Sequence, residues 1–200
     1  MGNAIAPLAT TLGEAHVRER LAQVVPTRFE GCDSTRYAAV AAVLRLNDTP
    51  EVLLIERAQQ EGDRWSGHMA LPGGMREPHD QNLLATAIRE TEEELSLTLQ
   101  HKQFVTRLDD VQAIARGKQV DLIIVPHVFI WHGEAPLTPN EEVADTLWAP
   151  LLPMMAGDLD TVRPYRHNGH ELPLPGFRVG GRVVWGLTHR MLELLFEAIR

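Results

Sequence analysis

Residues 71–97 read LPGGMREPHDQNLLATAIRETEEELSL, a diglycine followed by a helical pattern whose last turns are crowded with carboxylates. Four acidic side chains fall within five residues there: Glu90, Glu92, Glu93 and Glu94. Like charges one turn apart on a helix repel each other, so this arrangement is unfavourable unless something compensates for it. We therefore expect a positively charged partner close to this end of the helix.

The helical pattern covers residues 81–95, and each residue of a helix advances about 100° around its axis. The less polar side chains then form one stripe that can face a core: Leu84, Ala87, Ile88, Thr91 and Leu95. Glu90, Glu93 and Glu94 are spaced i, i+3 and i+4, and we expect them to share the opposite flank.

Three carboxylates on one patch indicate a site for a divalent cation. Hard cations such as Mg2+ prefer oxygen ligands and use carboxylates together with substrate phosphates. Arg89 lies one turn before Glu93 and can hold that carboxylate in place. A solvated acidic face with ordinary salt bridges is the alternative for the glutamates alone. The diglycine Gly73–Gly74, expected to turn tightly after a strand, favours the cation site, because glycine lets the backbone approach a ligand or metal.

The composition is that of a globular domain from a reducing compartment. Of the 200 residues 44% are hydrophobic and 23% charged, and the formal net charge of -8 argues against a nucleic-acid-binding surface. The single cysteine, Cys32, permits no intrachain disulfide, so we expect a cytoplasmic protein. Apolar runs are too short to span a membrane, and the N-terminus does not read as a secretory signal.

The rest of the chain alternates between helical and strand patterns, which predicts mixed α and β structure in one domain, a sheet covered by helices. A helix is expected at 11–25, where Thr11 and Glu14 suggest a capping box. Strands are predicted at 37–46, 51–58, 103–114 and 120–132, with a turn near 116–117 between the third and fourth. Residues 135–157 start as a Pro-rich loop and are expected to end in a short strand and helix. A hairpin region is expected at 165–186, and an amphipathic helix at 187–200 closes the chain.

The stretch RETEEELSL at 89–97 resembles the second half of the Nudix hydrolase signature, G-x5-E-x7-R-E-U-x-E-E-x-G-U, where U is a large aliphatic residue. Arg89, Glu90, Glu93 and Glu94 stand at the signature's Arg and Glu positions, and Leu97 fills its last aliphatic position. The resemblance implies a Nudix-type α/β/α sandwich, a mixed sheet flanked by helices. It divides the chain into an N-terminal helical extension at 1–36 and a Nudix hydrolase domain at 37–200.

The sequence departs from that signature at several positions. Thr91 replaces an aliphatic residue, and Ser96 replaces the signature's last glycine, so the turn after the helix is expected to form differently. The spacing from Gly74 to Arg89 is one residue longer than in the signature. The early glutamate of the signature therefore has no clean counterpart, and its neighbourhood offers three polar residues instead: Glu77, Asp80 and Gln81.

The resemblance extends to the coenzyme A pyrophosphatase branch of that family. LLIERA at 53–58 and LPGG at 71–74 are similar to the branch's upstream motif, as are NEEVADTLWAPL and VVWGLTHRML nearer the C-terminus. Arg64 and Gly67 follow the motif with one residue fewer between them, and Leu71 replaces its Phe. These departures leave the substrate open between coenzyme A and other nucleotides.

The resemblance also implies roles for individual residues. Glu90, Glu93 and Glu94 would hold Mg2+ or Mn2+, with the Gly74 carbonyl as a further ligand. One of these glutamates, or the loop carboxylate Glu142, would act as the catalytic base, although Glu142 equally suits a structural position beside the sheet. The substrate would be bound by two arginines that can contact phosphates and by the diglycine: Arg57, Arg64, Gly73 and Gly74. For Arg57 a salt bridge to a helix acid is the alternative.

Other side chains are ambiguous from the sequence. His68 can contact a phosphate but suits a structural role better. Trp65, Trp131 and Trp148 can stack on an adenine, yet Trp131 and Trp148 lie in strand patterns, where core packing is favoured.

Three classes of function are consistent with the sequence. The first is a metal-dependent pyrophosphohydrolase acting on coenzyme A or a derivative. The second is a Nudix hydrolase of ADP-ribose or nucleoside triphosphates, and the third is a non-catalytic nucleotide-binding module, which the intact glutamate set disfavours. The expected partner is a small nucleoside diphosphate derivative, without nucleic acid or membrane. The N-terminal and C-terminal helices are candidate contacts for a homodimer.

Overall fold

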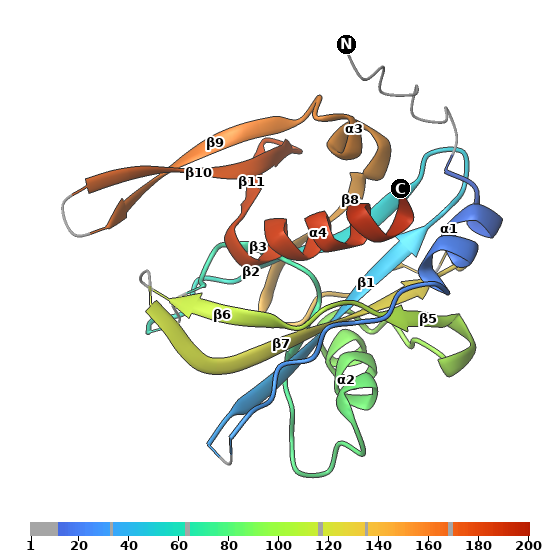
Figure 1. Ribbon diagram of the computed structural model, residues 1–200, viewed down its shortest axis with the longest axis horizontal. Helices are drawn as coiled ribbons and strands as arrows, with labels where there is room; N and C mark the ends of the chain where they lie inside the picture. The colour runs from blue at the N-terminus through green and yellow to red at the C-terminus, as the bar shows by residue number, and fades with distance from the viewer. Residues whose placement is uncertain (1–11, 33, 63–64, 116–117, 135, 168–169) are drawn as a thin grey trace.

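The computed structural model describes residues 12–200 apart from positions 33, 63–64, 116–117, 135 and 168–169, and it is drawn in Figure 1. Thr11, Arg64 and the turn at 116–117 therefore lie outside the described residues. The elements follow the chain in this order: α1 (Glu14–Leu21), β1 (Arg36–Arg45), β2 (Glu51–Arg57), β3 (Met69–Ala70), β4 (Gly73–Met75), α2 (Leu83–Leu95), η1 (His101–Gln103), β5 (Phe104–Arg107), β6 (Val111–Ala115), β7 (Lys118–Ile130), β8 (Val143–Pro150), α3 (Leu151–Ala156), β9 (Asp160–His167), β10 (His170–Val179), β11 (Arg182–Trp185) and α4 (Gly186–Ile199).

An eight-stranded mixed sheet forms the body of the molecule. Its central path runs β3-β2-β1-β7-β5, while β4 pairs with β1, β6 with β7 and β8 with β2. β1 and β7 are parallel, from Arg36 opposite Leu122 to Leu44 opposite Ile130, and the other pairs are antiparallel. A second, antiparallel sheet contains β11, β10 and β9 in that order.

Strand β1 explains why helices cover both faces of this sheet. Side chains alternate between the two faces of a strand, and nearly every residue of β1 is buried. Ala38, Val40, Ala42 and Leu44 pack into the core formed with α1 and α4, whereas Ala39, Ala41 and Val43 pack into the core formed with α2. Figure 1 shows α4 and α2 on opposite sides of β1. The α/β/α sandwich with a mixed sheet is confirmed.

The N-terminal helix belongs to the packed core. Val17 and Leu21 of α1 are fully buried in the same cluster as α4, and His16 Nε2 lies 3.3 Å from the Ile199 carbonyl. The helices named as dimer contacts thus turn their apolar sides inward, and a homodimer stays a prediction. The boundary between residues 36 and 37 also stays a prediction.

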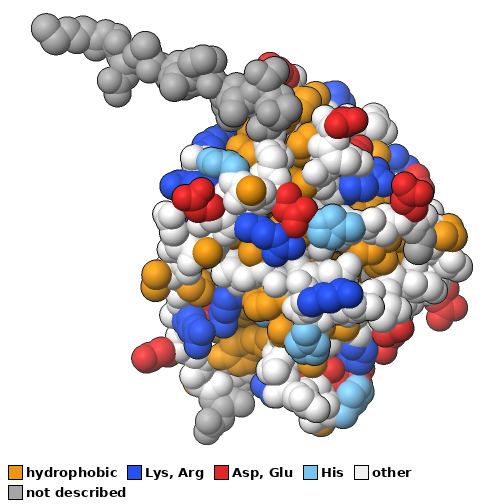
Figure 2. Space-filling model, turned by 90° about the vertical axis from the view of Figure 1, so that its right-hand side faces the viewer, with side chains coloured by type: hydrophobic (Ala, Val, Ile, Leu, Met, Phe, Trp, Pro, Cys, Tyr) orange, Lys and Arg blue, Asp and Glu red, His pale blue; other side chains and the backbone are white. Residues whose placement is uncertain are grey.

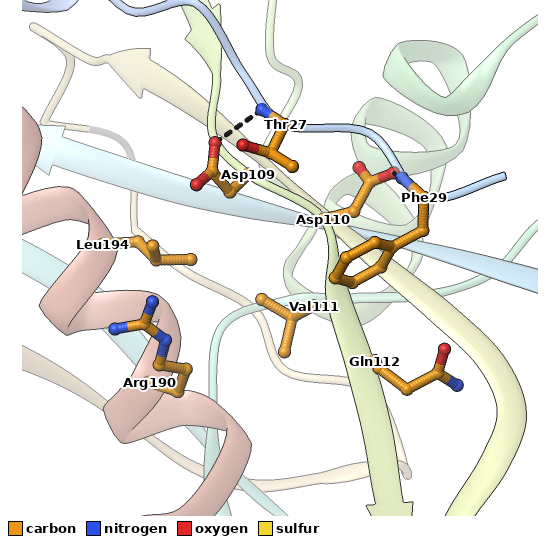
Figure 3. A pocket seen from close by; sticks show the side chains of 8 residues that line it. All are labelled: Thr27, Phe29, Asp109, Asp110, Val111, Gln112, Arg190 and Leu194. Carbon is orange, nitrogen blue, oxygen red and sulfur yellow. Dashed lines mark hydrogen bonds between the residues drawn. The ribbon is translucent and has the colours of Figure 1, made fainter.

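Hydrogen bonds hold the chain after α1 against the two residues that precede β6, Asp109 and Asp110. Asp109 accepts from the Thr27 N–H at 2.7 Å, Asp110 accepts from the Phe29 N–H at 2.9 Å, and the Asp110 N–H donates to the Thr27 carbonyl at 3.0 Å. A cavity of about 270 Å3 lies between this segment, β6 and α4, as Figure 3 shows. Val111, Gln112, Arg190 and Leu194 complete its lining, and none of its lining residues belongs to the predicted site.

The diglycine lies in a strand rather than in the expected turn. Gly73 and Gly74 begin β4 and pair with Val40 and Ala39 of β1. A Cβ on Gly73 would lie 2.3 Å from the Ala39 carbonyl oxygen, and the φ of Gly73 is +143°, so only glycine suits this close approach. The chain bends at Pro72 instead, and the pairing brings β4 beside α2.

Candidate active site

Helix α2 begins and ends with distinct caps. The side chain of Asn82 accepts from the Ala85 N–H at 3.0 Å and thereby satisfies one free donor of the first turn. At the other end Ser96 takes the left-handed conformation, with φ +54°, that glycine occupies more easily. The serine therefore adopts the C-terminal turn that the signature's glycine would provide, at a cost in backbone strain.

The three glutamates of α2 are not alike in their surroundings. Glu94 is 2% exposed and accepts from the Gly73 N–H at 2.8 Å, whereas the side chain of Glu93 is 55% exposed. The expectation that all three share the flank opposite the apolar stripe is wrong for Glu94. Glu94 follows Ala87 by seven residues, nearly two full turns, so both side chains lie on the buried side of the helix.

Burial governs the charge state of two of these groups. Desolvation raises the pKa of Glu94 to about 8, with a further rise from the neighbouring Glu90 and Glu142 charges, while the Gly73 N–H and Arg57 oppose it. Desolvation also raises the pKa of Glu90, which Arg89 partly offsets. The charge of Glu90 makes Glu94 harder to ionise, and the charges of Glu93 and Glu142 do the same to Glu90, which is the electrostatic situation that a bound divalent cation would relieve.

Arg89 organises the outer part of the cluster. Its Nη1 lies 2.9 Å from Glu93 Oε2 and 2.9 Å from Glu90 Oε1, and its Nη2 donates to the Met75 carbonyl at 3.0 Å. The prediction that Arg89 holds the Glu93 carboxylate is confirmed. The guanidinium is itself held by Asp80, a partner that the sequence offered only as one of three polar residues near the early signature position.

The remaining predicted residues converge from three other segments. Gly74 lies so close to Glu90 that a Cβ on it would fall 2.5 Å from that carboxylate. Arg57, at the end of β2, stabilises the charge of Glu94. Glu142 precedes β8, its carbonyl accepts from the Ala58 N–H at 2.8 Å, and its carboxylate raises the pKa of both buried glutamates.

The oxygen-rich donor set fits a hard divalent cation. It consists of carboxylates next to the backbone of Gly74, which has no side chain to block access. Burial makes two of these carboxylates, Glu90 and Glu94, harder to ionise. Within the described ranges, no three His, Cys, Asp or Glu side chains are already grouped tightly enough to hold an ion. A metal would therefore have to draw the carboxylates together, most of all the exposed Glu93.

Trp131 is a core residue, and the partly buried Trp148 packs against the same core. Trp131 is 6% exposed and stacks on Trp148, with ring centroids 5.8 Å apart and 10° between the ring planes. The prediction of core packing for this pair is confirmed. Trp185 of β11, which was not among the candidate stacking residues, contacts His68, the residue directly before β3, with ring centroids 4.7 Å apart.

The charged surface shows both signs together. On the face that Figure 2 presents, Lys and Arg side chains are interspersed with Asp and Glu. In the part of the chain that the structure describes, no helix has the length and apolar character needed to cross a membrane.

The chain belongs to the Nudix family, whose family model, described as NUDIX domain, matches residues 35–165. Among its relatives is the human mitochondrial coenzyme A diphosphatase NUDT8, 27% identical over 169 residues, which are 81% of this chain and 68% of that protein. The uncharacterized Nudix hydrolase NudL of Yersinia enterocolitica is 28% identical over 193 residues, 94% of this chain and 93% of that one.

Two further comparisons differ in what they cover. The uncharacterized protein C14C4.10c of Schizosaccharomyces pombe is 38% identical over 120 residues, 58% of this chain, but the match spans only 36% of that protein. The crystal structure of a MutT/nudix family protein from Enterococcus faecalis has a TM-score of 0.55 at 16% identity and covers 93% of this chain and 73% of that one. The latter supports the fold, and together the comparisons confirm the predicted class, a Nudix hydrolase.

Proposed function

We propose that this protein is a divalent-metal-dependent hydrolase that cleaves the diphosphate of coenzyme A or of a close derivative. The proposal is carried by the position of Arg57, the arginine of LLIERA, at the end of β2, from where its charge lowers the pKa of the buried Glu94. In this arrangement LLIERA, the motif that resembles the coenzyme A branch, supplies the positively charged Arg57 guanidinium to the carboxylate cluster. The similarity to a human coenzyme A diphosphatase over 81% of the chain supports the same substrate.

The reaction adds water across a phosphoric anhydride. An oxygen of water forms a bond to one phosphorus, the bond from that phosphorus to the bridging oxygen breaks, and the bridging oxygen leaves with the second phosphate. Coenzyme A would give 3',5'-ADP and 4'-phosphopantetheine. The obstacle is the negative charge that repels the nucleophile and grows on the leaving oxygen.

The predicted residues that the structure describes each have a task in this scheme. Glu90, Glu93, Glu94 and the Gly74 carbonyl would hold Mg2+ or Mn2+, which when bound neutralises phosphate charge and acidifies water. Arg57 would bind a diphosphate oxygen and orient the anhydride. Glu142, an exposed carboxylate close to Glu90 and Glu94, is the candidate to accept the proton of the attacking water. The diglycine backbone would admit the diphosphate beside them.

A substrate panel tests the proposal. The full chain is incubated with Mg2+ and, separately, coenzyme A, dephospho-coenzyme A, ADP-ribose and ATP, and products are identified by mass. We expect 3',5'-ADP and 4'-phosphopantetheine to form faster than any product of ADP-ribose or ATP. Faster turnover of ADP-ribose or ATP would reject coenzyme A as the substrate while leaving the Nudix hydrolase class intact. Absence of turnover on every compound would favour a nucleotide-binding module.

A further inference from the structure

Trp185, the last residue of β11, is surrounded by aromatic and basic side chains from two distant segments. The ring centroids of His68 and Tyr165 lie 4.7 and 5.7 Å from that of Trp185, and the guanidinium carbon of Arg163 lies 4.7 Å from the Trp185 ring centroid. We call these four residues the Trp185 cluster. At this distance the Arg163 charge is attracted by the face of the indole, which holds the guanidinium in a defined place.

The register of the second sheet explains how the cluster forms. Trp185 is opposite Gly176, which is opposite Thr161. Side chains alternate along a strand, so Arg163 and Tyr165 share the Trp185 face of β9, and Arg166 points to the other face. Figure 1 shows β9 and β10 extending away from the body of the molecule, while β11 leads into α4.

A backbone hydrogen bond joins the cluster to β2, the strand that ends at Arg57. The Arg57 N–H donates to the His68 carbonyl at 3.0 Å, and Arg57 is the side chain whose charge acts on Glu94. On the other side of the cluster, the Thr188 hydroxyl donates to the Met69 carbonyl at 2.9 Å. The Trp185 cluster is thus connected to the backbone of Arg57, one of the residues predicted to bind the substrate.

Arg163 differs from Arg182, another arginine of the second sheet, in its ion pairing. Arg182 joins this sheet to the main one through Glu56 at 2.6 Å and through Asp145, so its charge is neutralised. Arg163 is exposed, and among the described residues no carboxylate pairs with it. A guanidinium that is preorganised on an aromatic ring and keeps its N–H groups for an external acceptor is suited to bind a phosphate.

We propose that Arg163 binds a phosphate group of the substrate that is not part of the cleaved diphosphate. This inference rests on the proposed function, for which a third phosphate is the 3'-phosphate of coenzyme A. The sequence predicts Arg57 and Arg64 as the arginines that contact substrate phosphates. We assign the diphosphate to Arg57, which ends β2, and the additional phosphate to Arg163, because the Arg57–His68 hydrogen bond and the His68–Trp185 ring contact link the exposed guanidinium to the same strand.

Binding of two nucleotides to the full chain tests the inference directly. Adenosine 3',5'-bisphosphate and AMP differ by the 3'-phosphate alone, and calorimetry gives both dissociation constants. We expect the bisphosphate to bind at least about 10-fold more tightly than AMP, as one charge-assisted pair provides. Arg163→Gln removes this preference and leaves AMP binding unchanged, whereas Arg163→Lys, which keeps the charge without the planar fork, retains part of it.

Arg166→Gln is the matched control. Arg166 is in the same strand, its side chain is 88% exposed, and it faces away from Trp185. Its variant should keep the full preference for the bisphosphate. A preference that survives Arg163→Gln, or that Arg166→Gln abolishes equally, would overturn the inference, since a general charge effect of the β9–β10 ribbon would then explain the binding.

Hydrolysis of coenzyme A and dephospho-coenzyme A separates this inference from the proposed function. If the protein cleaves both with equal efficiency, and Arg163→Gln changes neither, the function stands and the phosphate contact is rejected. If coenzyme A is not cleaved but the bisphosphate preference disappears in Arg163→Gln, the contact stands and the function is rejected. A purely structural role of the cluster would lower both rates together and would also overturn the inference.

Discussion

Asp80 and Arg89 form a two-point ion pair, in which Nε and Nη2 of the guanidinium each donate to one carboxylate oxygen of Asp80 at 3.0 Å. Asp80 is 6% exposed, and Arg89 holds the pKa of that carboxyl well below its usual range. The other donors of Arg89 reach Glu90 and Glu93. A residue in the loop before α2 therefore orients two of the candidate metal ligands.

Replacing Asp80 should weaken both the fold and the reaction. Asp80→Asn leaves Arg89 partly buried without its charge partner, and we expect the free energy of unfolding in urea to fall by about 3 kcal/mol. Arg89 would then bind Glu90 and Glu93 more tightly, so a higher Mg2+ concentration would be needed for half-maximal rate. The control is Glu77→Gln, because the side chain of Glu77 forms an exposed pair with His79 and its replacement should change stability by less than about 1 kcal/mol. Equal effects of the two substitutions would contradict a positioning role for Asp80.

The carboxylates of α2 should matter for turnover far more than for folding. Glu93→Gln and Glu94→Gln each remove a candidate metal ligand, so we expect kcat to fall by about 100-fold or more. Without metal, Glu94→Gln should not destabilise the protein, because it removes a buried group whose ionisation burial already opposes. Steady-state kinetics and urea unfolding in a chelator measure the two effects. Glu92→Gln is the control, since Glu92 is exposed and its side chain accepts from the Thr98 hydroxyl instead.

His127 should make stability depend on pH. It is 4% exposed, its Nδ1 lies 3.1 Å from the Val125 carbonyl, and burial, with a smaller contribution from the Arg107 charge, lowers its pKa to about 4. In the unfolded chain the imidazole of His127 has its ordinary pKa near 6.5, so it binds a proton at pH values where the folded protein keeps it neutral. Stability is therefore fully present above about pH 6.5 and falls as the pH decreases toward 4, by roughly 2–3 kcal/mol at pH 4.5.

Urea unfolding at pH 7 and pH 4.5 measures this loss. His127→Gln, whose amide can still donate to the Val125 carbonyl, should lose correspondingly less stability between the two pH values, because carboxylate titration is common to both proteins. His101→Gln is the control at an exposed histidine and should behave like the parent protein. An identical pH dependence in the His127 variant would show that this imidazole is not the cause.

Replacing Ser96 by glycine should stabilise the folded protein. It is the single non-glycine residue with a positive φ among the residues that the structure describes. Ser96→Gly relieves the left-handed strain and should raise the free energy of unfolding by about 1 kcal/mol, or the Tm by about 2–4 °C. Ser96→Ala keeps the strained Cβ and removes only the hydroxyl, so it should bring no gain. A gain from alanine equal to that from glycine would rule out backbone strain as the reason.

Local patterns of the sequence predicted the elements well, and contacts between distant segments explain what they missed. Helix α2 and the two arms of the β1–β2 hairpin follow from periodicity, and Leu44 indeed lies opposite Val52. The single predicted strand at 103–114 is two strands, β5 and β6, each paired separately with β7. The position of the diglycine depends on its pairing with β1, which no local pattern reveals.

The residues of the candidate site also fall into two groups, those that local spacing predicts and those that only contacts between distant segments reveal. The four signature residues could be found because one helix carries them at fixed spacing. Asp80 could not be assigned from spacing alone, since the loop to Arg89 determines which of three polar residues meets the guanidinium. The Trp185 cluster was missed because it joins His68 to residues about a hundred positions later, through a second sheet that carries no motif at Arg163 or Tyr165.

The same substitution should affect stability at Gly73 and turnover at Gly74, two neighbouring glycines of β4. Gly73→Ala places a Cβ 2.3 Å from the Ala39 carbonyl oxygen and 2.5 Å from the Val40 Cα, at a φ of +143°. Backbone of a central strand cannot move aside cheaply, so we expect a loss of at least about 3 kcal/mol in the free energy of unfolding.

Gly74→Ala places its Cβ against the Glu90 carboxylate, 2.5 Å from Cδ, which is the far end of a flexible side chain. Glu90 can rotate away, so stability should change by less than about 1–2 kcal/mol. The rotation moves the carboxylate away from its position beside Gly74, and we expect kcat to fall by about 10-fold or more while the apparent affinity for Mg2+ weakens. Urea unfolding and Mg2+-dependent kinetics on both variants provide the comparison. A Gly74 variant that unfolds as readily as the Gly73 variant, or one with normal turnover, would separate Gly74 from the metal site and leave it a packing residue of the sheet.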